Sequence, residues 1–207
     1  MSNPIPEKKK NSFVLFVMAG LAIWLTCLLT LASWYQKNYI QNFTQASPDF
    51  LNSEYTDKWF KGLLEQLPKK SSNRRIIQLW KPNCLCNRFA QRHALNGIES
   101  AKQSKTEHIT LIPNASDSEV VALQALNPDT KVLTLQTDQL VNWPTSPSVF
   151  IEGPLNQLLY FGPLGFGAFC SQPSTGVIGQ ILASSTPSNT KPFYNIIGKG
   201  CFCSWKE

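Results

Sequence analysis

Residues 74–98 read RRIIQLWKPNCLCNRFAQRHALNGI, and this stretch decides which fold the sequence predicts. Residues 74–80 are mostly apolar and rich in strand-forming side chains, which predicts a β-strand. Residues 85–98 place apolar side chains at helical spacing and predict a helix. Two cysteines, Cys84 and Cys86, therefore lie where a strand gives way to a helix.

A cysteine at such a junction is favoured to react. The unpaired N–H groups and the positive end of a helix favour thiolate over thiol, and thiolate is both the nucleophile of disulfide exchange and a ligand for soft metals. A disulfide between Cys84 and Cys86 would close a small, strained ring, which would make it easy to reduce and oxidising. A structural disulfide or two inert core thiols are the alternatives.

Strand and helix patterns continue to alternate after this unit. Further strands are predicted at residues 108–113, 131–135, 148–152 and 157–162, and a terminal strand or extended arm at 194–204. Helices are predicted at residues 57–67, 116–126 and 177–183, the second with Ser116 as its N-cap. Residues 153–156 form a tight hairpin connection. This order predicts an α/β fold in which a mixed sheet has helices on both faces.

The N-terminal segment decides the compartment. Residues 12–36 carry no charge, and about 20 apolar residues at 1.5 Å each cross a 30 Å hydrocarbon layer. A cleaved signal peptide is the alternative, but its apolar region usually spans only about 7–15 residues. We therefore expect a tail at residues 1–11 and a transmembrane helix at residues 12–35.

The charges that flank this helix predict its orientation. Lys8, Lys9 and Lys10 precede it, whereas Lys37 is the only basic residue on the other side for about twenty residues. The positive-inside rule keeps the N-terminus in the cytoplasm and exports residues 37–207. In a bacterium this predicts a single-pass inner-membrane protein with a periplasmic C-terminal domain, where disulfides can form.

Composition divides the exported part and excludes one class of partner. Residues 36–71 read as a polar stalk followed by an amphipathic helix, in which Trp59 and Phe60 are expected to cover the sheet, and residues 72–207 form the domain. The net charge of +6 includes no dense basic stripe, so we expect no nucleic-acid partner. Nucleotide-binding and zinc-protease motifs are absent from the sequence.

The unit from Arg74 to Ile98 resembles the active-site unit of the thioredoxin fold, which has an apolar strand, a tryptophan, a cysteine four residues later and a helix. Residues 145–153 (TSPSVFIEG) resemble the cis-proline strand of that fold and the hairpin after it. The added helix and strand between the two resemble membrane-anchored periplasmic thioredoxins of the cytochrome-c-maturation type. The whole chain is also similar to an uncharacterised family of single-span proteobacterial proteins. The resemblance covers residues 72–185 and implies a thioredoxin-like mixed sheet.

The resemblance implies roles for three residues. Cys84 matches the attacking cysteine, Trp80 the tryptophan before it, and Pro147 the cis-proline that faces the dithiol, so that the Ser146–Pro147 bond is expected to be cis and close to Cys84.

Two positions depart from the pattern of the family. The second cysteine would fall at Asn87, whereas Cys86 comes one residue early, and the buried acid would fall at Gln78, which carries no carboxylate. These departures put the usual redox potential and proton relay in doubt, but they leave a dithiol in place.

A second Cys-x-Cys pair, Cys201 and Cys203, lies near the C-terminus. We expect it to lie near the first pair, where the two could exchange electrons or together supply four thiolates to copper(I) or zinc. A disulfide that staples the tail is the alternative. Cys170 is the odd thiol, which either pairs with a C-terminal cysteine or simply packs. His93 is more often a satisfied histidine than a metal ligand.

Three functions follow from these patterns. The leading hypothesis is a membrane-tethered thiol–disulfide oxidoreductase that acts on exported thiol proteins or on another redox protein and needs no cofactor. In it Cys84 attacks, Cys86 resolves the mixed disulfide, and Pro147 presents backbone groups to an extended substrate segment. The second hypothesis is a copper- or zinc-binding or delivery protein. The third is a non-catalytic envelope module that its disulfides stabilise.

Overall fold

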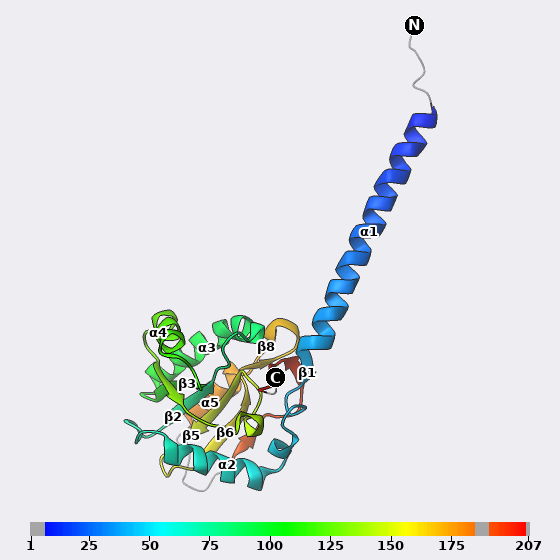
Figure 1. Ribbon diagram of the computed structural model, residues 1–207. Coiled ribbons are helices and arrows are strands. Elements are labelled where there is room, and N and C mark those ends of the chain that lie inside the picture. Colours follow the sequence, from blue (N-terminus) through cyan, green and yellow to red (C-terminus); the bar gives the residue numbers. More distant parts are fainter. Residues whose placement is uncertain (1–6, 185–190, 206–207) are drawn as a thin grey trace. The chain divides into compact units, whose positions relative to one another are not determined.

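The computed structural model describes residues 7–184 and 191–205 (Figure 1). The chain divides into two compact units, Met1–Asn38 and Tyr39–Glu207. The first unit consists of helix α1 (Glu7–Tyr39), in which Phe13–Tyr39 is long and apolar enough to span a membrane. Helix formation thus begins within the predicted tail, of which residues 1–6 lie outside the described residues.

The second unit is built on a six-stranded sheet in the order β4-β3-β2-β5-β6-β9. Strands β2, β3 and β4 are parallel to one another, whereas β5 runs antiparallel to both β2 and β6. The bounds of the six strands are β2 (Arg75–Leu79), β3 (Glu107–Pro113), β4 (Lys131–Leu135), β5 (Ser148–Glu152), β6 (Leu158–Pro163) and β9 (Phe193–Tyr194). The predicted mixed sheet is confirmed.

The described part of this domain holds four α-helices, and Figure 1 shows α2 along one side of the sheet and α3 and α4 along the other. Their bounds are α2 (Ser53–Gln66), α3 (Leu85–Gln103), α4 (Asp117–Leu126) and α5 (Thr175–Ala183). The predicted N-cap is confirmed, because Ser116 and Glu119 form a reciprocal capping box. Helix α3 runs past its predicted end because Ile98 and Ala101 continue its buried face.

Short elements complete the domain. They are β1 (Ile40–Asn42), β7 (Gly165–Phe166), β8 (Gln172–Pro173), β10 (Lys199–Cys201) and the 3-10 turns η1 (Pro48–Leu51), η2 (Leu140–Asn142) and η3 (Ala168–Cys170). Strand β10 pairs antiparallel with β1, so the expected terminal strand does form, but outside the six-stranded sheet.

The main core lies between the sheet and α2. The ring of Phe150 on β5 stacks on Phe161 of β6 with centroids 4.5 Å apart, and the rings of Trp59 and Phe60 stack on Phe150 from α2 at 5.3 and 5.5 Å. Stacked aromatic pairs of this kind add to the free energy gained by burying their area. Trp59 and Phe60 therefore cover the sheet, as predicted.

The predicted stalk is wrong for the residues that follow α1. Ile40 of β1 pairs with Cys201, and Phe43 and Phe50 are almost fully buried. The ring centroid of Phe43 lies 5.5 Å from that of Phe161 and 5.1 Å from that of Phe202. Two aromatic rings in an otherwise polar stretch thus help to hold it against the domain together with the β1–β10 pairing, because each buries a large apolar area.

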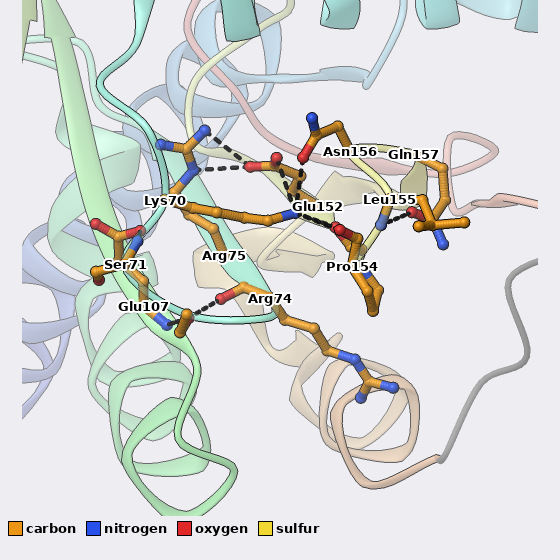
Figure 2. A network of polar contacts seen from close by, with 12 residues as sticks. Lys70, Ser71, Arg74, Arg75, Glu107, Glu152, Pro154, Leu155, Asn156 and Gln157 are labelled. Carbon is orange, nitrogen blue, oxygen red and sulfur yellow. Dashed lines mark hydrogen bonds and ion pairs between the residues drawn. The ribbon is translucent and has the colours of Figure 1, made fainter.

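A buried ion-pair network closes one end of β2 and β5 (Figure 2). The guanidinium of Arg75 lies 2.8 Å from the Glu152 carboxylate, and both side chains are 2% exposed. Lys70 donates to the other oxygen of that carboxylate at 3.3 Å and to Asn156 Oδ1 at 2.8 Å. Because Asn156 lies in the predicted hairpin turn, the network fixes that turn to the sheet.

Candidate functional site

The loop from β2 to α3 places the first cysteine pair at the start of a helix. Cys84 is the N-cap of α3 and Cys86 lies in its first turn. The residue before them, Asn83, has φ of 60°, a left-handed conformation that asparagine adopts more readily than most residues. The N–H of Trp80 donates to Leu111 O at 3.0 Å and so ties the start of the loop to β3.

The two Cys-x-Cys pairs are bonded to each other. Cys84 forms a disulfide with Cys203 and Cys86 with Cys201, with Cα atoms 6.0 and 5.3 Å apart. The C-terminal pair thus lies beside the first pair, as expected, but the Cys84–Cys86 disulfide considered from the sequence does not form. The reason is the pairing of β10 with β1, which brings two further cysteines within the Cα separation that disulfides need.

The segment before β5 lies against the same cysteines. The Ser146–Pro147 bond is cis, as predicted. The Ser146 N–H donates to Cys203 O at 3.0 Å, and the Cys203 N–H donates back to Ser146 O at 2.8 Å. Cys84 Sγ lies 4.0 Å from the same Ser146 oxygen. The residue before Pro147 therefore contacts both members of the Cys84–Cys203 disulfide.

The C-terminal arm, residues 199–205, is held by contacts besides the disulfides. Phe202 is buried in the main core, and Trp205 Nε1 donates to Pro144 O at 2.6 Å. The Lys81 ammonium donates to Ser204 O at 2.7 Å and lies 5.9 Å from the centroid of the Trp205 ring. Cys201 and Cys203 are thus fixed parts of the site.

Asn87 is a site residue whose role sequence reasoning missed. Its amide donates to Lys81 O and its oxygen accepts from the Ser146 hydroxyl at 3.1 Å, while the Lys81 N–H donates to that hydroxyl at 2.9 Å. The position where the resemblance expects a second cysteine therefore joins the cysteine loop to the proline segment. A signal was present, because a buried amide needs partners and Asn87 follows Cys86 directly.

Solvent reaches the four sulfur atoms unequally. Cys86 and Cys201 are 0% exposed and Cys84 is 6% exposed, whereas Cys203 is half-buried. The Sγ atoms of Cys84, Cys86 and Cys203 all lie within 4.8 Å of one another. Sulfur atoms this close can pass a disulfide from one to another, and after reduction they can turn toward a common soft metal ion.

Cys170 and His93 take no part in the cluster. Cys170 is buried outside any disulfide, and burial raises the pKa of its thiol to about 11. His93 Nε2 donates to Cys170 O at 2.6 Å. Cys170 thus packs, and His93 is a buried histidine whose Nδ1 has no hydrogen-bond partner among the described residues. Cys27 is a free cysteine on α1.

Several solved structures are similar to this chain at low identity. A secreted disulfide oxidoreductase from Mycobacterium tuberculosis, homologous to E. coli DsbE, is 13% identical with a TM-score of 0.40 and covers 54% of this chain and 81% of its own. The N-terminal domain of PilB from Neisseria gonorrhoeae is 20% identical with a TM-score of 0.38, over 57% and 81%. A thiol:disulfide interchange protein from Bacteroides sp. is 11% identical with a TM-score of 0.35, over 42% and 61%. With scores below 0.5, these likenesses carry no argument about function.

The domain itself has the thioredoxin-like arrangement that the sequence resemblance implied. Its central parallel strands, the helix that begins at Cys84 and the cis bond before Pro147 converge on one end of the sheet. A comparison with curated proteins finds no match. A family model matches residues 56–205, and the chain belongs to the family described as domain of unknown function (DUF6436).

Proposed function

We propose that this protein is a thiol–disulfide oxidoreductase in which Cys84–Cys203 is the disulfide that exchanges with partner proteins. The observation that carries the proposal is the meeting of two Cys-x-Cys pairs at the start of α3. A structural staple needs one disulfide, whereas four adjacent sulfur atoms form a system in which exchange can continue internally.

The first step is an attack by a partner thiolate on Cys84 Sγ. A sulfur–sulfur bond forms between the partner and Cys84, the Cys84–Cys203 bond breaks, and the electron pair leaves with Cys203 as thiolate. A second thiolate of the partner then attacks the partner's own bonded sulfur and releases Cys84 as thiolate. The partner has lost two electrons and gained a disulfide, and Cys84 and Cys203 have gained those two electrons. The reverse sequence reduces a partner disulfide.

The second disulfide can then exchange with the Cys84 thiolate. The Cys84 thiolate attacks Cys86 Sγ, which lies within 4.8 Å, so that a Cys84–Cys86 bond forms and Cys201 leaves as thiolate. The two thiols are then both on the C-terminal arm. Sequence reasoning gave Cys86 the resolving role, whereas the pairing favours Cys203 as the sulfur released first and Cys86 as the sulfur that acts second.

The helix start makes Cys84 a good leaving group when the mixed disulfide is resolved and a good attacking group in the internal step. As the N-cap of α3, Cys84 lies beside unpaired N–H groups and the positive end of the helix, which favour its thiolate. The backbone groups of Ser146 hold Cys203 in place opposite it. We further propose that α1 anchors the protein in a bacterial inner membrane with the domain in the periplasm, where exported thiol proteins or a redox protein are the partners.

Metal binding is the second candidate function, and one observation favours it. The sulfur atoms of Cys84, Cys86 and Cys203 lie close enough to turn toward one ion once both disulfides are reduced. Thiolates are preferred ligands of zinc and copper(I), and Cys201 offers a fourth. Reduced protein that retains one equivalent of zinc or copper(I) through gel filtration, and loses it in the Cys84→Ser variant, would establish this role.

The test of the proposed exchange uses the oxidised full-length chain in detergent and a synthetic peptide with two thiols. We expect the peptide to be oxidised stoichiometrically, the Cys84→Ser variant to lose at least about 100-fold in rate, and the Cys27→Ser variant to match the parent chain. Equal rates for the Cys84→Ser variant and the parent would contradict the proposal, and no exchange by the parent chain would leave a structural role.

A further inference from the structure

A cavity of about 590 Å³ lies beside Cys84 at the start of α3. This volume is in the range of ligand pockets. Cys84 lines it, whereas its disulfide partner Cys203 does not. The cavity is therefore the approach by which a partner can reach Cys84.

The walls of the cavity are apolar in part. Trp80 and Leu85 form part of it, and Leu126 at the end of α4 contributes a side chain that is 62% exposed. Exposed apolar side chains that gather around a reactive group are typical of a surface that receives a partner.

Arg88 gives the cavity a single sign of charge. Among the described residues that line it, Arg88 alone is charged, and it is exposed with no hydrogen bond or ion pair to any described residue. It is the fourth residue of α3, near the helix end where a cation is unfavourable for helix stability. The ammonium of Lys81, in contrast, already donates a hydrogen bond to Ser204 O and lies over the Trp205 ring. Arg88 thus lowers the stability of the helix at this position, and its guanidinium is available to an incoming anion.

We infer that the cavity selects partner segments in which an acidic residue lies next to the reacting cysteine. The guanidinium of Arg88 is suited to a carboxylate, with which it forms paired charge-assisted hydrogen bonds, while the apolar side chains of the cavity can contact a neighbouring apolar side chain of the partner. This inference rests on the proposed exchange at Cys84. It assigns Arg88 the role of a specificity-determining residue, and it names an acidic, cysteine-bearing polypeptide segment as the occupant.

The experiment compares two dithiol peptides that differ only in the residue beside one cysteine, glutamate in one and lysine in the other. The readout is the ratio of their second-order rate constants with each oxidised protein. A ratio within one variant cancels any general effect of the substitution on the reactivity of Cys84. The matched control is Arg92→Glu, because Arg92 is exposed on the same helix one turn later but does not line the cavity.

We expect the parent chain and Arg92→Glu to prefer the acidic peptide by about tenfold at low ionic strength, and the preference to shrink in high salt. Arg88→Glu should reverse it. An unchanged ratio in Arg88→Glu, or equal effects of the two substitutions, would overturn the inference. Dithiothreitol, which carries no charge, tests the exchange at Cys84 separately from the preference for an acidic peptide. If it is oxidised at Cys84 while the peptide ratio stays near one, only the specificity inference fails, and if it is not oxidised, the proposed function fails as well.

Discussion

The two ends of the β2–β5 strand pair are held by different kinds of interaction. At one end Arg75 pairs with Glu152 across the strands, and these side chains form a buried ion pair. At the other end Leu79 lies opposite Ser148, and the chain continues from each strand into the cysteine cluster. One end is thus held by charge and hydrogen bonds, and the other by covalent bonds that a thiol can break.

This difference separates a structural end from a reactive end. The carboxylate of Glu152 is buried and is paired with both Arg75 and Lys70. The sulfur end joins segments 119 and 115 residues apart in sequence through bonds that can exchange. We therefore expect reduction to change the sulfur end alone.

The largest expected effect on stability concerns the sulfur end. A variant with Cys84, Cys86, Cys201 and Cys203 all changed to alanine should lower the free energy of unfolding by about 4 kcal/mol, because the two disulfides together close a loop of more than a hundred residues in the unfolded chain. Urea denaturation of the full chain in detergent measures this. The control is Cys27→Ala, which removes a free thiol on α1 and should leave the midpoint unchanged. A loss below about 1 kcal/mol would show that the arm is held almost entirely by Phe202 and Trp205.

A substitution at the charged end should lower the free energy of unfolding by a somewhat smaller amount. Glu152→Gln leaves the Arg75 charge buried without its partner, which costs about 3 kcal/mol. Asp129→Asn, which breaks the exposed pair with Lys102, should cost less than about 1 kcal/mol. The reduction potential of the cysteines should be the same in both variants and the parent. A shift in that potential with Glu152→Gln would mean that the two ends are coupled.

Acid should weaken the domain through His108 on β3. Burial lowers the pKa of His108 to about 4, from an ordinary value of 6.5. The unfolded chain therefore binds a proton between pH 6.5 and 4 that the folded chain excludes, so stability falls as the pH drops through this window, by about 3 kcal/mol in total. His108→Phe should reduce that slope, as measured by urea denaturation at pH 7 and 4.5. Parallel slopes for the parent and the variant would assign the pH dependence to other groups.

Local sequence patterns predicted most of the fold. Alternating apolar runs located β4 and β5 to the residue, and the capping residue Ser116 located α4, because these elements are specified by their own side chains. The packing of the residues after α1, which were predicted to be a stalk, was missed for a related reason. Phe43 and Phe50 are isolated apolar residues with no periodicity, and only their contacts with Phe161 and Phe202 show where they pack.

The sequence predicted which cysteines form the candidate site, but it did not predict which disulfides they form. The sequence identified Cys84, Cys86, Cys201 and Cys203 as one chemical group, because they form two repeated pairs. Which cysteine bonds to which depends on the pairing of β10 with β1 and of Cys203 with Ser146, and these contacts join residues far apart in the chain. The same holds for Asn87, whose role is defined by a partner 59 residues away.

We propose Cys84–Cys203 as the exchanging disulfide and Cys86–Cys201 as the internal one. The rate at which two double variants of the full chain oxidise a dithiol peptide distinguishes these two roles. Cys86→Ser/Cys201→Ser keeps the first disulfide and should retain the initial rate of the parent within about threefold. Cys84→Ser/Cys203→Ser keeps only the second and should be slower by at least about 100-fold, because both of its sulfur atoms are inaccessible to solvent. Faster exchange by Cys84→Ser/Cys203→Ser than by Cys86→Ser/Cys201→Ser would contradict the account.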